Sequence, residues 1–225
     1  MIRSFGLFNK TVPANTPQFG IPHPGTFIVD GKGLVVSKYF EEDYRQRYTS
    51  SEILVRQFGE NADASGQTIE TKHLRLTSSA SLATVHVGQR LALVLDIDLK
   101  RKMHVYAPGV VGYIPIEWKI TGNPGLQAHD VVYPVSTTET LKAIKETVPV
   151  YKGRFKLIQD ITIAPEAQLK PVLNSEGNLI VEGEFRYQAC DDRVCYLPQT
   201  IPLKWILRYE TLDRQRAPAE IQRKR

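Results

Sequence analysis

The chain has 225 residues, of which 42% are hydrophobic and 24% are charged, so general disorder is excluded. No apolar run is long enough to span a bilayer, and the first residues lack the pattern of a signal peptide. The formal net charge of +5 comes from basic residues that are interspersed with acidic ones, which argues against nucleic acid as a partner. The length allows one large domain or two small ones.

Small polar residues at positions 61–70 are typical of a linker. They separate an N-terminal segment, 1–60, from a larger domain at 71–208. The last residues, 209–225, are basic and are predicted to form a flexible tail.

The N-terminal segment has the pattern of a short α/β unit. Residues 26–30 and 34–40 are apolar and β-branched, and Gly31 and Gly33 between them indicate a turn, so a β-hairpin is predicted. A helix that carries Ile53 and Phe58 is expected to follow. So few elements make a thin core, and the segment is therefore interpreted as part of a domain.

The larger domain is predicted to be all-β. Polar turn sequences separate its strand-like runs, which favours an antiparallel β-sandwich. The segment 136–148 is polar and is predicted to be a long loop or partly helical. The expected strands lie at 91–97, 105–106, 114–118, 155–163, 179–189 and 201–207.

Cys190 and Cys195 are the only cysteines, and they follow a strand with a clear alternation. Its apolar side chains share one face and its polar ones share the other. Cys190 continues the polar set, so we expect its sulfur to point away from the sandwich core and to be accessible. The polar alternation runs through Glu182, Glu184, Arg186 and Gln188.

Three interpretations of the pair remain open at this point. A structural disulfide across so short a loop would stabilise the fold by only about 2 kcal/mol. A redox pair would need a sulfur that a thiolate can reach. Binding of a soft metal by Cys190, Cys195 and Met103 is the third interpretation. The five histidines have no ligand-like spacing and are predicted to be surface or packing residues.

The residues around the pair resemble the N-terminal periplasmic domain of the thiol:disulfide interchange protein DsbD. The resemblance rests mainly on the motif at 187–198, and weaker matches lie at 104–106, 114–118 and 149–153. The motif contains Tyr187, Gln188, Cys190, Asp191, Asp192, Cys195 and Tyr196.

This resemblance implies an immunoglobulin-like sandwich whose cysteine pair shuttles electrons to extracytoplasmic thiol proteins. It implies that Cys190 forms the mixed disulfides and that Cys195 resolves them. A loop shields the disulfide in that family, and the matching region here is 138–150, with Leu141 and Ile144 as candidate apolar covers.

The segment 19–30, together with the hairpin and helix that follow, resembles the C-terminal half of an AhpC/TSA-type redoxin, which has a thioredoxin-like fold. Pro24 matches the position of the cis-proline in that family. Residues 1–60 contain no cysteine, so they cannot perform thiol peroxidase chemistry. We expect the chain to be truncated at its N-terminus, which would account for the missing export signal.

The sequence therefore predicts a mainly β protein, a thiol:disulfide oxidoreductase that relays reducing equivalents through Cys190 and Cys195 in the periplasm or a similar compartment. Thioredoxin-like proteins or a membrane electron donor would be its partners, and no cofactor or metal is expected. One alternative is a non-catalytic β-sandwich interaction module with a structural disulfide. Another is a fragment of a larger peroxiredoxin-like thiol peroxidase.

Overall fold

The structure is a computed structural model, and it describes residues 6–23, 25–40, 53, 66–141 and 146–211. Several sequence-based expectations fall outside these residues. They concern Pro24, Ile144, the helix around Ile53 apart from Ile53 itself, residues 61–65 of the linker, and the basic tail from residue 212 onward. The linker residues Thr68–Glu70 form a strand, contrary to the prediction.

The N-terminal segment contains the predicted hairpin, formed by β1 (Gly25–Val29) and β2 (Val35–Phe40). The turn between them is held by Asp30, whose Oδ1 accepts hydrogen bonds from the backbone N–H groups of Lys32 and Leu34, both at 2.9 Å. Such Asx-type contacts stabilise turns locally. The hairpin is confirmed, while a thioredoxin-like domain is not shown by these two strands.

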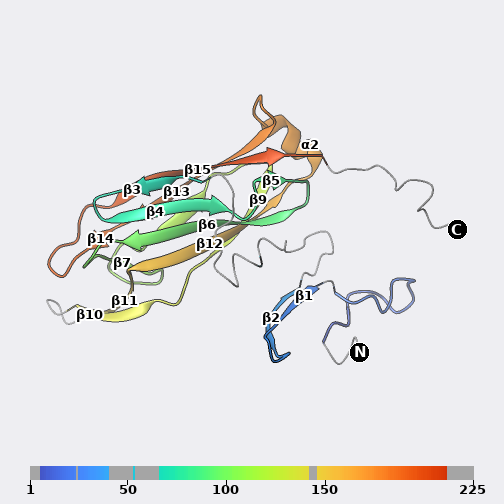
Figure 1. The fold of residues 1–225 in the computed structure, drawn as a ribbon, viewed down its shortest axis with the longest axis horizontal. Coiled ribbons are helices and arrows are strands. Elements are labelled where there is room, and N and C mark those ends of the chain that lie inside the picture. The colour runs from blue at the N-terminus through green and yellow to red at the C-terminus, as the bar shows by residue number, and fades with distance from the viewer. Residues whose placement is uncertain (1–5, 24, 41–52, 54–65, 142–145, 212–225) are drawn as a thin grey trace.

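The larger domain is an immunoglobulin-like β-sandwich, as predicted, with two sheets that face each other (Figure 1). The first sheet has the strand order β3-β4-β6-β12-β9 and the second has the order β5-β15-β13-β8. All pairs within them are antiparallel except β5 with β15. The first sheet consists of β3 (Thr68–Glu70), β4 (Leu74–Ala80), β6 (Arg90–Leu99), β12 (Arg154–Ile163) and β9 (Leu126–Val132). The second consists of β5 (Thr84–Val85), β15 (Gln199–Tyr209), β13 (Asn178–Tyr187) and β8 (Glu117–Ile120).

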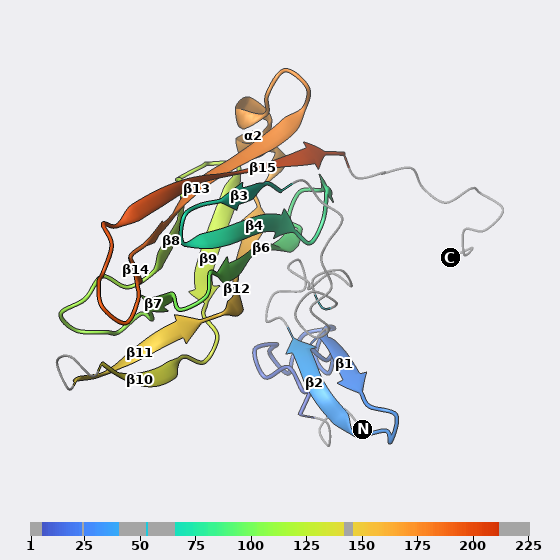
Figure 2. The same ribbon diagram turned by 60° about the vertical axis from the view of Figure 1, so that its left-hand side comes forward.

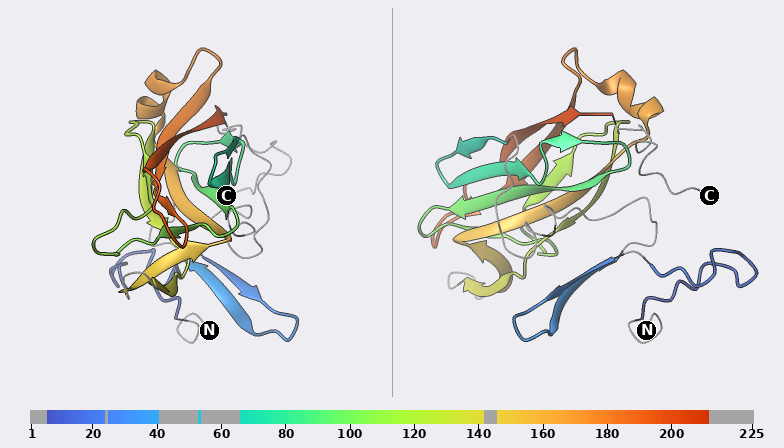
Figure 3. Two further views of the ribbon diagram at one scale, coloured as in Figure 1. Left: turned by 90° about the vertical axis from the view of Figure 1, so that its left-hand side faces the viewer. Right: turned by 45° about the vertical axis from the view of Figure 1, so that its right-hand side comes forward.

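A third, smaller sheet lies at one end of the sandwich, with the strand order β10-β11-β7-β14. Figure 2 shows it at the end opposite the short helix α2 (Glu166–Leu169), which continues into a 3₁₀ turn at Lys170–Val172. Figure 3 shows the two facing layers as seen from this end (left). The sheet consists of β10 (Thr137–Leu141), β11 (Glu146–Lys152), β7 (His104–Tyr106) and β14 (Ala189–Cys190).

Alternation of apolar and polar side chains builds the core between the facing sheets. In β13, Leu179, Val181, Phe185 and Tyr187 are fully buried, whereas the glutamates between them are exposed. Trp205 of β15 crosses the sandwich, and its indole N–H donates to the backbone oxygen of Ser79 in β4 at 3.1 Å. A buried indole needs such a partner, and this bond ties the two sheets together.

All six predicted strand regions contain strands. The fifth, 179–189, is interrupted at Gln188, and the third has shifted boundaries. There the strand begins at Glu117 rather than at residue 114. Pro115 has no N–H to donate to a ladder, and it instead forms an isolated parallel bridge with Tyr106. The prediction of a loop or helix at 136–148 was wrong, because this segment forms most of the β10–β11 hairpin. The sequence prediction also missed β3, β4, β5 and β9.

Among the described residues, no helix is long and apolar enough to cross a membrane.

Gly183 lies where β13 approaches β8 closely. A Cβ atom added there would lie 2.5 Å from the backbone oxygen of Lys119, which cannot move without disturbing the strand pair. We expect Gly183→Ala to lower the free energy of unfolding by roughly 1–3 kcal/mol, the usual effect of overpacking. Urea denaturation measures this. Gly122→Ala is the matched control, because a Cβ at Gly122 meets no atom within 4 Å. Equal stability of the two variants would contradict the prediction.

Candidate functional site

The site begins where the chain leaves one sheet for another. Strand β13 ends at Tyr187, Gln188 interrupts the ladder, and Ala189 and Cys190 then pair with Val105 and His104 of β7. Ala189 packs against the main core on one face of the third sheet. Cys190 faces the other way, into a second apolar cluster.

The expectation that Cys190 is accessible was therefore wrong. Its side chain does point away from the main core, as the strand phase predicted, but its exposed fraction is 0%. The third sheet provides a cover that the alternation within β13 does not reveal. The cluster around Cys190 contains Tyr106, Val148 and Val150, with Val110 and Tyr113 packed against them.

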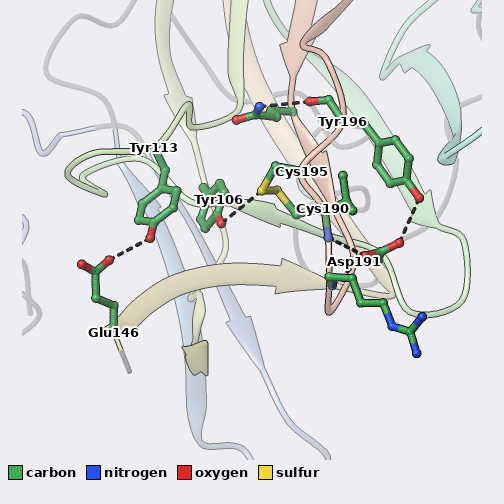
Figure 4. Close-up of a disulfide and its surroundings, with 10 residues drawn as sticks. Tyr106, Tyr113, Glu146, Cys190, Asp191, Cys195 and Tyr196 are labelled. Atoms are coloured by element: carbon green, nitrogen blue, oxygen red, sulfur yellow. Dashed lines mark hydrogen bonds between the residues drawn. A yellow bond between two sulfur atoms is a disulfide. The ribbon is translucent and has the colours of Figure 1, made fainter. Parts of the chain in front are cut away.

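Cys190 and Cys195 form a disulfide, with a Cα–Cα distance of 4.0 Å. Within the described part of the chain there is no free cysteine. Unlike Cys190, Cys195 is exposed. The bond, drawn in Figure 4, therefore joins a residue buried in the second cluster to a residue that is exposed.

A tight turn connects the cysteines, and Asp191 organises it. Its Oδ1 accepts hydrogen bonds from the backbone N–H groups of Arg193 and Val194, both at 2.8 Å. Its Oδ2 accepts a hydrogen bond from the hydroxyl of Tyr196 at 2.9 Å. These hydrogen bonds lower the pKa of the Asp191 carboxyl, so it is ionised at neutral pH.

Two stacked tyrosine rings lie beside the disulfide (Figure 4). The ring centroids of Tyr106 and Tyr113 are 4.4 Å apart, and the Tyr106 oxygen lies 3.6 Å from Cys195 Sγ. A disulfide sulfur carries no hydrogen, so the Tyr106 hydroxyl is the donor. Burial raises the pKa of Tyr106. The Tyr113 hydroxyl donates to Glu146 at 2.7 Å, a contact that raises the pKa of Tyr113 to about 12. Both hydroxyls are therefore protonated donors at neutral pH.

The other motif residues support the turn from outside. Gln188 Nε2 donates to the backbone oxygen of Tyr196 at 3.0 Å, and the Tyr196 ring stacks on His73 with centroids 4.4 Å apart. Tyr187 lies in the main core, where its hydroxyl contacts Thr71 and Gln199. Asp192 is exposed, next to the turn-forming Asp191.

The shielding region proposed at 138–150 is a β-hairpin rather than a loop. Leu141 is the last residue of β10 and pairs with Glu146, while Ile144 lies outside the described residues. The apolar cover from this region comes from Val148 and Val150 of β11. The predicted region thus does contribute to the burial of Cys190, through these two residues.

The structure gives no support to a soft-metal site. Met103 packs against the main core, on the other side of β7 from the cluster that holds Cys190. In the parts of the chain that are described, no group of three or more His, Cys, Asp or Glu side chains could hold a metal ion.

Sequence reasoning missed His104, Tyr106 and Tyr113 as neighbours of the pair. His104 and Tyr106 are two residues apart in a strand, so they share a face, and this alternation was visible in the sequence. The sequence did not show that β7 pairs with β14, which brings that face to Cys190.

The family described as thiol:disulfide interchange protein DsbD, N-terminal, matches residues 74–204. The chain belongs to this family. The match leaves the resemblance of the preceding segment to a redoxin unsupported. A comparison with curated proteins gives no significant match.

Two examples illustrate the solved structures that are similar to this chain. One is the N-terminal periplasmic domain of ScsB from Proteus mirabilis, with 14% sequence identity and a TM-score of 0.44. The similar region covers 66% of this chain and 52% of that one, so the chain spans about half the length of the ScsB structure. The other is the yeast GGA1 GAE domain, with 8% identity, a TM-score of 0.33, and coverage of 62% and 96% respectively.

Removal of the Asp191 carboxylate should loosen the turn of the DsbD-type motif. We expect Asp191→Ala to speed reduction of the disulfide by dithiothreitol, because two backbone N–H groups and the Tyr196 hydroxyl lose their acceptor. Asp191→Asn keeps an acceptor oxygen and should remain closer to the wild type. Asp192→Ala removes the same charge from the neighbouring position and serves as the control. If both alanine variants are reduced at the same rate, the loss of a negative charge, rather than the loosened turn, controls how fast dithiothreitol reduces the disulfide.

Proposed function

We propose that this domain exchanges disulfides with thiol proteins through the Cys190–Cys195 pair, and that Cys195 is the sulfur attacked by the partner. The observation that carries the proposal is the contrast in exposure. Cys195 is exposed, whereas the exposed fraction of Cys190 is 0%. Exchange requires that a thiolate approach one sulfur of the disulfide. The cysteine that the thiolate can reach is therefore the one attacked. This order reverses the roles that the family resemblance implied for the two cysteines.

The exchange would proceed in two steps. A partner thiolate attacks Cys195 Sγ, the Cys190–Cys195 bond breaks, and Cys190 Sγ leaves with the electron pair. A second thiolate of the partner then attacks the mixed disulfide and releases reduced Cys195. The partner is thereby oxidised and this domain is reduced. In the opposite direction, the Cys195 thiolate attacks an oxidised client and Cys190 resolves the mixed disulfide.

The surroundings of the pair fit this chemistry better than a purely structural bond. Cys190 and Cys195 already form an antiparallel backbone bridge, and the Asp191 turn already closes the loop between them. In the chain-entropy model so short a loop adds only about 2 kcal/mol of stability. The Tyr106 hydroxyl would stabilise negative charge that develops on Cys195 when it is the leaving group.

The partners would be thioredoxin-like proteins or a membrane electron donor, as in the DsbD family. The domain would act in the periplasm or another extracytoplasmic compartment, where disulfides persist. The ScsB domain with a similar fold is described as periplasmic.

Single-cysteine variants test the proposal. Cys190→Ser leaves the exposed thiol, and its matched control, Cys195→Ser, leaves the buried one. Each is incubated with a thioredoxin that has one active-site cysteine, activated as a mixed disulfide with a chromogenic thiol. We expect Cys190→Ser to form the covalent complex at least about tenfold faster, because its thiol is accessible. The complexes are counted by mass spectrometry.

Faster coupling by Cys195→Ser would overturn the proposed order of attack. If neither variant couples, thioredoxin-like proteins are not the partners. The reduction potential of the wild-type pair separates exchange from a structural role. A value below about −300 mV would identify a structural disulfide and contradict the exchange function.

A further inference from the structure

A buried histidine faces the inner cysteine of the pair. His104 pairs directly with Cys190 in the β7–β14 ladder and with Lys152 of β11 on its other side. Residues opposite each other in antiparallel strands project to the same face, with Cβ atoms about 5 Å apart. The His104 ring also packs edge-on against Tyr106, with centroids 5.6 Å apart. His104 thus lies on the face of the third sheet that covers Cys190.

The imidazole of His104 has a nitrogen atom without a hydrogen-bond partner among the described residues. The exposed fraction of the residue is 2%, and its buried Nε2 forms no hydrogen bond with any described residue. Leaving such a group unsatisfied destabilises the fold, a cost that a phenylalanine or leucine in the same place would avoid. Packing alone therefore does not account for a histidine here.

Charged side chains from β10, β11 and the turn between the cysteines influence His104. Glu139 of β10, Lys152 of β11, and Asp191 and Asp192 of the turn all act on it. Lys152 and Glu139 form an ion pair with each other. Burial lowers the pKa of His104, so at neutral pH the ring is uncharged and has a nitrogen lone pair that can accept a proton.

The proposed exchange would place a negative charge on Cys190, next to His104 in the ladder. When the disulfide breaks, Cys190 Sγ becomes a thiolate in an apolar cluster, where an unpaired charge is strongly disfavoured. The Tyr106 hydroxyl contacts Cys195 rather than Cys190. In the disulfide form neither sulfur carries a hydrogen, so Cys190 has no proton to offer to the histidine. The reduced form supplies one.

We propose that His104 holds the proton of Cys190 during thiol:disulfide exchange, an inference that rests on the proposed function. In the resolving step the Cys190 S–H proton moves to His104 Nε2, and the thiolate attacks Cys195 Sγ of the mixed disulfide. The Cys190–Cys195 bond forms, and the partner sulfur leaves with the electron pair. In the reverse step the imidazolium returns the proton to the departing Cys190 thiolate. One proton and one electron pair move in each direction, and no further reactant is needed.

The test follows the resolving step in the full chain. The reduced protein reacts with glutathione disulfide, and samples quenched with acid are resolved by mass spectrometry, so formation of the glutathione adduct and its later release are timed separately. His104→Phe keeps a ring without nitrogen, and His104→Gln keeps a polar group that cannot carry a proton. His129→Phe is the matched control, because His129 is a half-buried histidine that is hydrogen-bonded to Thr162. It lies in β9, the edge strand of the first sheet, whereas Cys190 belongs to the third sheet.

We expect both His104 variants to release glutathione from the adduct at least about a hundredfold more slowly at neutral pH, the lower end of the usual range of acid–base assistance. The rate of adduct formation at the exposed Cys195 should be unchanged. The histidine-dependent inflection should also disappear from the pH profile of the release step, whereas His129→Phe keeps it.

A second measurement does not depend on exchange. In the Cys195→Ser background Cys190 is the only thiol, and its ionisation is followed by thiolate absorbance. Adding His104→Phe or His104→Gln should raise the pKa of Cys190, because the thiolate loses its imidazolium partner. Since either substitution suffices, failure of one variant to fold leaves the other as the test.

Wild-type release rates and pH profiles in folded His104 variants, with an unchanged pKa of Cys190, would overturn the role of His104 and leave the exchange function intact. If the wild-type protein forms no adduct with glutathione disulfide, or never releases it, the exchange function itself fails and the role of His104 fails with it.

Discussion

The pairing of β14 with β7 is the contact on which the site depends. It consists of two residue pairs, Ala189 with Val105 and Cys190 with His104. Because the chain leaves the β13–β15 ladder at Gln188, these residues join a sheet that lies across the end of the sandwich. Ala189 then packs on the main core, and Cys190 packs on a separate cluster. Without this change of sheet, Cys190 would lie on the exposed face of β13 beside Arg186.

The change of sheet also makes the two cysteines differ in exposure. Cys190 is enclosed by side chains of β7 and β11, while the turn held by Asp191 returns the chain to the surface at Cys195. A disulfide with one buried and one exposed cysteine gives an incoming thiolate a single point of attack. In the proposed exchange Cys190 Sγ would be the leaving group in an apolar environment, where nearby polar groups would have to stabilise its negative charge. In the structure His104 is the ladder partner of Cys190, and the Tyr106 hydroxyl lies 3.6 Å from Cys195 Sγ.

The β10–β11 hairpin connects this local geometry to the rest of the domain. Strand β11 pairs with β7, supplies Val148 and Val150 to the cover of Cys190, and places Glu146 within hydrogen-bond distance of Tyr113. The hairpin is therefore part of the same sheet as the cysteine strand, and the cover and the disulfide are positioned by one continuous ladder. Membership of the DsbD N-terminal family agrees with a redox role for such a site.

The sequence by itself determined the local features of this protein. The alternation in β13 located its buried face, the polar and glycine-rich turns separated the strands, and the motif around Cys190 and Cys195 identified the family. These features depend on near neighbours in the chain, for which side-chain periodicity and turn chemistry are sufficient. The accessibility of Cys190 could not be obtained in this way. It depends on residues about 40 and 85 positions away, in β11 and β7, and only long-range strand pairing brings them together. The same pairing decided which histidine and which tyrosine lie beside the disulfide, because a ladder register between distant strands leaves no local trace in either of them.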